Sequence, residues 1–138
     1  MVEAIKSKYP SITSVGYDPA IPGRDSLTVD RADFLTCTDV LEHIPEEDLP
    51  AVIEKISSLS SNCFFALHHG EAVCVLPNGE NAHCTVKPTS WYYELFRRYF
   101  KHVICLPIDA ISSVMVTFDV SQEVKDAYMK VLASGLFI

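Results

Sequence analysis

The stretch Asp-Phe-Leu-Thr-Cys-Thr-Asp-Val-Leu-Glu-His-Ile, residues 33–44, contains the clearest fold signal of the chain. Its apolar run at 34–38 predicts a buried strand. Asp39, Glu42 and His43 then crowd the point where that strand should end. Because ligands bind at the carboxyl ends of the strands in open α/β sheets, the stretch predicts a functional site as well as a strand.

Strand-like and helix-like segments alternate on both sides of this stretch. Further strands are predicted at 12–17, 27–29, 63–67, 103–106 and 114–118. Helices are predicted at 2–9, from near Pro50 to Leu59, from Thr89 or Ser90 to Tyr99, and at 122–133. The connection between the last two strands is too short for a crossover helix, so these strands should be antiparallel. The sequence therefore predicts one α/β domain over residues 1–138, with a mostly parallel sheet and an antiparallel C-terminal edge.

Composition narrows the class of protein. The chain has 138 residues, is 49% apolar and has a net charge of −7. This acidic balance argues against a nucleic-acid surface, which needs clustered lysine and arginine. Five cysteines without a C-x-x-C pair fit a reducing compartment better than a zinc knuckle or a disulfide framework. No signal peptide and no apolar run of membrane-spanning length is present, so we expect a cytoplasmic protein with no nucleic-acid or membrane partner.

The acid-rich end of the 34–38 strand has several chemical interpretations. If residues 39–43 turn helically, Asp39, Glu42 and His43 share one face. Two carboxylates and an imidazole could bind a divalent cation, or could place a general base beside a substrate. In the simpler interpretation, Glu42 and His43 only orient the loop and cap neighbouring backbone groups.

Other polar residues follow strand ends. Asp18 follows the predicted strand 12–17, where a carboxylate could accept hydrogen bonds from ribose hydroxyls or could simply start an Asp-Pro turn. His68 and His69 follow the strand 63–67, and His83 lies in a loop of about twenty residues, a length that suggests a functional or locally ordered segment. Trp91 could anchor the core or stack on a ligand.

In this order, the residues resemble a class I S-adenosylmethionine-dependent methyltransferase over nearly the whole chain. The run Asp-Val-Leu-Glu-His-Ile, residues 39–44, is typical of that family. The stretch Leu-Pro-Asn-Gly-Glu-Asn-Ala-His, residues 76–83, followed by Trp91, resembles a bacterial subgroup of uncharacterised methyltransferases. The resemblance implies a Rossmann-like methyltransferase sheet and S-adenosylmethionine as the cofactor.

The resemblance also implies roles for particular residues. Asp18 would bind the ribose hydroxyls of the cofactor, and Cys37, Thr38 and Asp39 would line its methionine side. The catalytic side would be formed by Glu42, His43 and His83, with His68 near the acceptor, which we expect to be a small molecule. In one branch of the superfamily an acid-x-x-Glu-His cluster and a later histidine bind a metal. Asp39, Glu42, His43 and His83 match that pattern only loosely, so the resemblance assigns no metal ligand.

One part of the family pattern is absent from this sequence. The first family strand ends in a glycine-rich turn that lets the backbone approach the cofactor. The five glycines of this chain include no two that are close together. We therefore expect a domain that lacks the first strand and is truncated at its N-terminus, a fragment or degenerate member with weak or no activity alone. The alternatives are a non-enzymatic interaction module and a divalent-metal-binding domain.

The missing strand has a structural consequence. It would normally lie between the strands at 12–17 and 34–38. Either those two strands pair directly, or one apolar edge stays open and favours self-association into a homo-oligomer.

Overall fold

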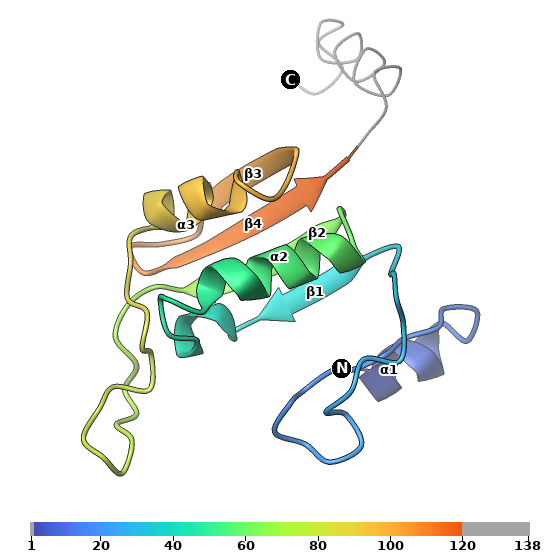
Figure 1. The fold of residues 1–138 in the computed structure, drawn as a ribbon, viewed down its shortest axis with the longest axis horizontal. Helices are drawn as coiled ribbons and strands as arrows, with labels where there is room; N and C mark the ends of the chain where they lie inside the picture. The colour runs from blue at the N-terminus through green and yellow to red at the C-terminus, as the bar shows by residue number, and fades with distance from the viewer. Residues whose placement is uncertain (1, 120–138) are drawn as a thin grey trace, which may run out of the picture. The chain divides into compact units, whose positions relative to one another are not determined.

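The computed structural model describes residues 2–119, which divide between two compact units (Figure 1). Unit 1 ends at Arg31 and unit 2 begins at Ala32. The helix predicted at 122–133 lies outside the described residues. The expectation of one domain over residues 1–138 stays a prediction.

Unit 1 consists of one short helix followed by turns and extended coil. The helix α1 (Val2–Lys8) ends just before Pro10, as the sequence predicts, because proline cannot continue the hydrogen-bond ladder. The chain then passes close to α1, where a Cβ at Gly16 would lie 3.0 Å from a methyl group of Val2. The strands predicted at 12–17 and 27–29 are wrong, since both segments are coil. A strand needs a neighbouring backbone for its hydrogen bonds, and within unit 1 neither segment has one.

Unit 2 contains a four-stranded mixed sheet with the order β1-β2-β4-β3. Its strands are β1 (Leu35–Thr38), β2 (Cys63–His68), β3 (His102–Pro107) and β4 (Ser112–Phe118). The β1–β2 pair is parallel, whereas β4 runs antiparallel to both β2 and β3. The predicted antiparallel closing pair is confirmed. The sheet is mixed rather than mostly parallel, because the segment 12–17 contributes no strand to it.

Three helical segments connect these strands. They are the single 3-10 turn η1 (Leu41–His43), α2 (Leu49–Leu59) and α3 (Thr89–Phe96). Pro50 lies in the first turn of α2, where its missing N–H leaves no hydrogen bond unmade. The predicted helix 89–99 is shorter in the structure, and its last residues form a turn. None of the helices within residues 2–119 has the length and apolar character that a membrane span requires.

The core lies between the sheet and the helices α2 and α3, which cover the same face (Figure 1). Alternate residues of β2 point into this core, as the period of a strand requires. Phe65 lies at its centre, and its ring meets those of Phe96 and Phe100 at centroid distances of 4.5 Å and 6.0 Å. The ring of Phe65 thus joins the sheet to α3.

Replacing Phe65 by alanine should lower the free energy of unfolding by about 3–5 kcal/mol, because the change removes a fully buried ring and leaves a cavity. Chemical denaturation followed by circular dichroism measures this loss. The control is Tyr17→Ala, since this aromatic residue is 53% exposed. The control should change stability by no more than about 0.5 kcal/mol. Equal losses in the two variants would contradict this description of the core.

Candidate functional site

The parallel strands β1 and β2 end at the same edge of the sheet, and Glu42 connects these ends. The turn η1 follows β1 and buries Glu42 to 1% exposure. One carboxylate oxygen, Oε1, accepts a hydrogen bond of 3.1 Å from the backbone N–H of His68 at the end of β2. The other oxygen, Oε2, is buried and has no hydrogen-bond partner within the described residues.

The loop between β2 and α3 brings His83 to this edge. Asn81 holds the loop together, because its Oδ1 accepts from the backbone N–H groups of Ala72 and His83 while its amide donates to the Ala72 carbonyl. The loop reverses at Gly79, whose φ of +86° suits glycine. The loop is thus locally ordered, which is one of the two expectations that its length suggested.

His43 and His83 are oriented by backbone carbonyl groups. His43 Nδ1 lies 2.8 Å from the carbonyl oxygen of Ala82, and His83 Nδ1 lies 2.7 Å from that of Gly70. A carbonyl oxygen can only accept, so each Nδ1 carries the proton and each Nε2 keeps its lone pair in the neutral ring.

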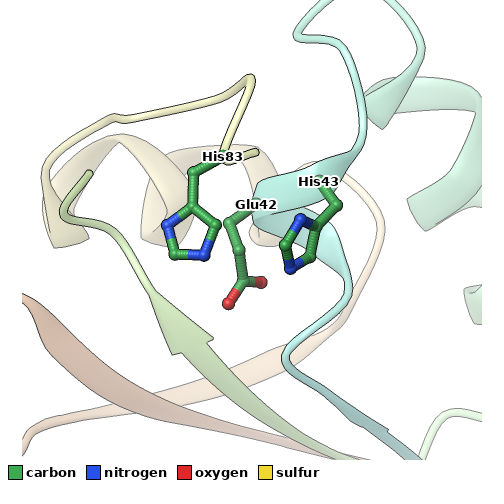
Figure 2. Close-up of side chains that lie close together, drawn as sticks. All are labelled: Glu42, His43 and His83. Carbon is green, nitrogen blue, oxygen red and sulfur yellow. The ribbon is translucent and has the colours of Figure 1, made fainter. Parts of the chain in front are cut away.

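The three side chains form one cluster. Glu42, His43 and His83 offer ligand atoms that all lie within 4.8 Å of one another. Figure 2 shows the carboxylate of Glu42 between the two imidazole rings, whose centroids are 4.8 Å apart. The structure thus brings together the three residues that the sequence predicts for the catalytic side.

Asp39 does not join this cluster. Its φ is +53°, a left-handed conformation, and the helical turn begins only at Leu41. The condition under which Asp39 would share a face with Glu42 and His43, a helical turn over residues 39–43, is therefore not met. Aspartate tolerates this conformation better than most residues, although it costs on the order of 1 kcal/mol. The backbone N–H of Asp39 instead donates to Ala66 and extends the β1–β2 pairing.

The neighbouring histidines of β2 have different environments. The ring of His68 lies 5.0 Å from that of His83, and its Nδ1 is buried without a hydrogen-bond partner within residues 2–119. His69 is buried and its Nε2 lies 2.8 Å from the hydroxyl of Thr89 at the start of α3. Burial lowers the pKa of His69, and the adjacent His68 lowers it further. His68 therefore borders the cluster, whereas His69 fixes the start of α3.

Two of the predicted cofactor residues lie at the end of β1. Cys37 and Thr38 are both partly buried there. Burial raises the pKa of the Cys37 thiol to about 12, and the negative charge of Glu42 adds to this effect. Cys37 is thus an uncharged thiol at neutral pH, close to the site.

Asp18 lies in unit 1 and has a local role there. Its Oδ1 accepts a hydrogen bond of 3.0 Å from the backbone N–H of Ala20. This contact agrees with the turn-forming interpretation of the Asp-Pro pair. The proposed contact of Asp18 with a cofactor ribose stays a prediction.

Sequence reasoning missed the residues that hold the site in place. Thr85 is buried, and its backbone N–H donates to the carbonyl of Glu42 while its hydroxyl donates to that of Ile44. The hydroxyl of Tyr92 donates in turn to the Thr85 carbonyl, which joins η1 to α3. Most of these contacts use backbone groups, as do those from Gly70 and Ala82. Every residue has such groups, so the sequence contains no signal for them.

Comparison with known proteins gives a likeness in structure and none in sequence. No family model matches the chain, and no curated protein matches its sequence. An O-methyltransferase family protein from Burkholderia thailandensis has a similar structure, with a TM-score of 0.51 and 15% sequence identity. The likeness covers 69% of this chain and 32% of that protein, so this chain matches about a third of its length. At this identity the likeness supports a methyltransferase-like fold and nothing finer.

The buried thiol of Cys37 predicts a loss of stability at alkaline pH. Its pKa is about 12 in the folded chain and 9.0 in an exposed thiol. Its contribution to stability is therefore complete below pH 9 and falls as the pH rises from 9 to 12, because the unfolded chain releases the proton more readily. Denaturation at several pH values should show a smaller alkaline loss for Cys37→Ala than for the unaltered protein. Cys74→Ala replaces an exposed thiol and should behave like the unaltered protein; identical pH profiles for all three would contradict the prediction.

Proposed function

We propose that this chain is a cytoplasmic, S-adenosylmethionine-dependent methyltransferase-like protein with weak or no activity alone. The observation that supports it best is the sheet, in which a parallel pair is closed by an antiparallel hairpin, together with its likeness to the O-methyltransferase family protein. The cluster of Glu42, His43 and His83 at the carboxyl edge of that sheet agrees with a site on the acceptor side.

The cluster offers the groups that methyl transfer needs from a protein. Transfer from a sulfonium to a nucleophile is a direct displacement, so the protein mainly positions the reactants and, where needed, accepts a proton. The free Nε2 atoms of His43 and His83 could accept that proton from the acceptor. Buried Glu42 would hold the edge in shape through its bond to the His68 N–H. The name of the structural neighbour makes a small molecule with an oxygen nucleophile the first acceptor class to test.

The cofactor side is the weaker half of the proposed site. This chain has no glycine-rich turn for the cofactor to approach, and Asp18 already accepts a bond from Ala20. A cofactor bound by Cys37, Thr38 and Asp39 at the end of β1 would lack that close backbone contact.

Of the two alternatives, an interaction module and a divalent-metal-binding domain, one is favoured by a specific observation. The clustered ligand atoms of Glu42, His43 and His83 favour the metal-binding domain. Metal binding by this cluster does not require S-adenosylmethionine. Metal binding and the methyltransferase-like function could therefore both belong to this edge of the sheet.

Calorimetric titration of the chain with S-adenosylmethionine should give no measurable heat of binding at micromolar concentrations, because the glycine-rich floor of the pocket is missing. A micromolar dissociation constant would contradict the proposed weakness. In that case Asp18→Asn tests the assignment, since removing a ribose-binding carboxylate should weaken binding at least tenfold. The matched control is Asp25→Asn in the same unit, which should leave the affinity unchanged.

We also propose that this chain associates with a second copy of itself. Among the described strands, β1 pairs with β2 and lies at one edge of the sheet. Phe34, which is 57% exposed, lies directly before β1 and would offer apolar contact to the second copy.

Sedimentation velocity at increasing concentration should therefore show a dimer or larger species. Phe34→Lys should shift the distribution towards monomer, because it replaces the exposed apolar ring by a charge. Val73→Lys places the same charge at a fully exposed residue of the β2–α3 loop and serves as the control. A monomer at all concentrations, or an equal effect of the two lysines, would contradict the proposal.

A further inference from the structure

We propose that Glu42, His43 and His83 bind a divalent transition-metal ion through Glu42 Oε2 and the Nε2 atoms of the two histidines. The proposal deepens the metal-binding alternative above. It rests on the geometry of these three side chains and does not require the cofactor to bind.

The first argument is the incomplete hydrogen bonding of Glu42. Glu42 is 1% exposed, and within residues 2–119 only its Oε1 has a hydrogen-bond partner. A buried carboxylate oxygen without a hydrogen-bond partner is unfavourable, because the charge has left water without a compensating contact. A cation beside Oε2 would remove that cost, and both nearby imidazoles offer lone pairs to the same ion. Glu42 therefore has the environment of a ligand rather than that of a core residue.

The second argument is the tautomer of the histidines. Hydrogen bonds of 2.8 Å and 2.7 Å to the carbonyls of Ala82 and Gly70 fix the proton of each ring on Nδ1. Metal-binding histidines commonly donate one ring N–H to a backbone carbonyl and bind the ion through the other nitrogen. Both rings of the cluster show this arrangement, although they come from segments forty residues apart in the sequence.

The third argument is distance. One potential ligand atom from each of the three side chains lies within 4.8 Å of those from the other two. Metal bonds of about 2.0–2.2 Å place neighbouring ligand atoms roughly 3–4 Å apart. A movement of about 1 Å therefore completes the site, and His43 can make it because its side chain lies at the surface.

The ligand set also selects the kind of ion. Two imidazoles and one carboxylate suit zinc, iron(II), manganese or cobalt, whereas magnesium and calcium prefer oxygen ligands. Three protein ligands leave at least one position for water or another small ligand. Such an ion would also join η1 to the β2–α3 loop, which already meet through the bond from Thr85 to Glu42.

Zinc alone is the probe for the first experiment, titrated calorimetrically without S-adenosylmethionine. Zinc also binds exposed thiols, so the titration uses the Cys74→Ser/Cys84→Ser background, which removes both exposed cysteines of the loop. We expect one equivalent to bind. Glu42→Gln and His83→Gln should each weaken that binding by more than about tenfold, because each removes one ligand. Glu80→Gln and His102→Gln make the same chemical changes outside the cluster and should leave the affinity unchanged.

A spectroscopic readout keeps the test valid if a variant folds poorly. Nitrogen-detected NMR of the imidazoles should show the Nδ1–H tautomer for His43 and His83 without metal. Zinc should then shift the Nε2 signals of these two rings and leave that of His102 in place. Binding that survives both substitutions, no binding at all, or unmoved signals would each overturn the proposal. None of these results depends on S-adenosylmethionine. A failure of the metal proposal would therefore not contradict the proposed methyltransferase-like function, which the titration with S-adenosylmethionine tests separately.

Discussion

The hydrogen bond from the His68 backbone to the carboxylate of Glu42 is the contact on which the sheet edge depends. It joins the turn after β1 to the end of β2, and the Glu42 carbonyl joins the same turn to Thr85 in the following loop. Three segments distant in sequence thus meet at one residue. Burying a carboxylate at this junction costs desolvation free energy. An apolar side chain of similar size would fill the same space without that cost. The burial of this carboxylate is in line with the proposed role of Glu42 in chemistry at this edge.

The parts of the fold that the sequence predicted are those in which local pattern and tertiary packing agree. Strands β1 and β2 are apolar runs that end at polar residues, and α2 presents its apolar residues at helical spacing to the core. The segment 12–17 has an equally strand-like pattern and is coil. Its residues satisfy the local preference, but a strand exists only where another backbone accepts its hydrogen bonds. Whether such a neighbouring backbone is present depends on the tertiary structure and not on the local sequence. The predicted sheet was mostly parallel because it counted the segment 12–17 as a strand.

In the candidate site too, the local sequence predicts some of the residues, whereas their contacts depend on the tertiary structure. Glu42 and His43 could be predicted because both follow a strand at the binding edge, and the resemblance pointed to His83. The three-residue spacing from Asp39 to Glu42 implies a shared face only if the chain turns helically, and a φ of +53° at Asp39 ends that periodicity. The cofactor contact of Asp39 stays a prediction. The carbonyls of Gly70 and Ala82 decide which nitrogen of each histidine is free. Their position depends on the path of a long loop, which no local pattern specifies.

The two chemistries proposed for this edge compete for the same atoms. The Nε2 lone pair of a histidine can accept a proton from a methyl acceptor or bind a metal ion, but it cannot do both at once. If an ion occupies the cluster, His43 and His83 are ligands, and a base must come from elsewhere. His68 is the nearest remaining imidazole, 5.0 Å from His83 and with an unpartnered Nδ1 among the described residues. The occupancy of the cluster, rather than the identity of its residues, therefore decides which groups of this edge remain free to act as bases.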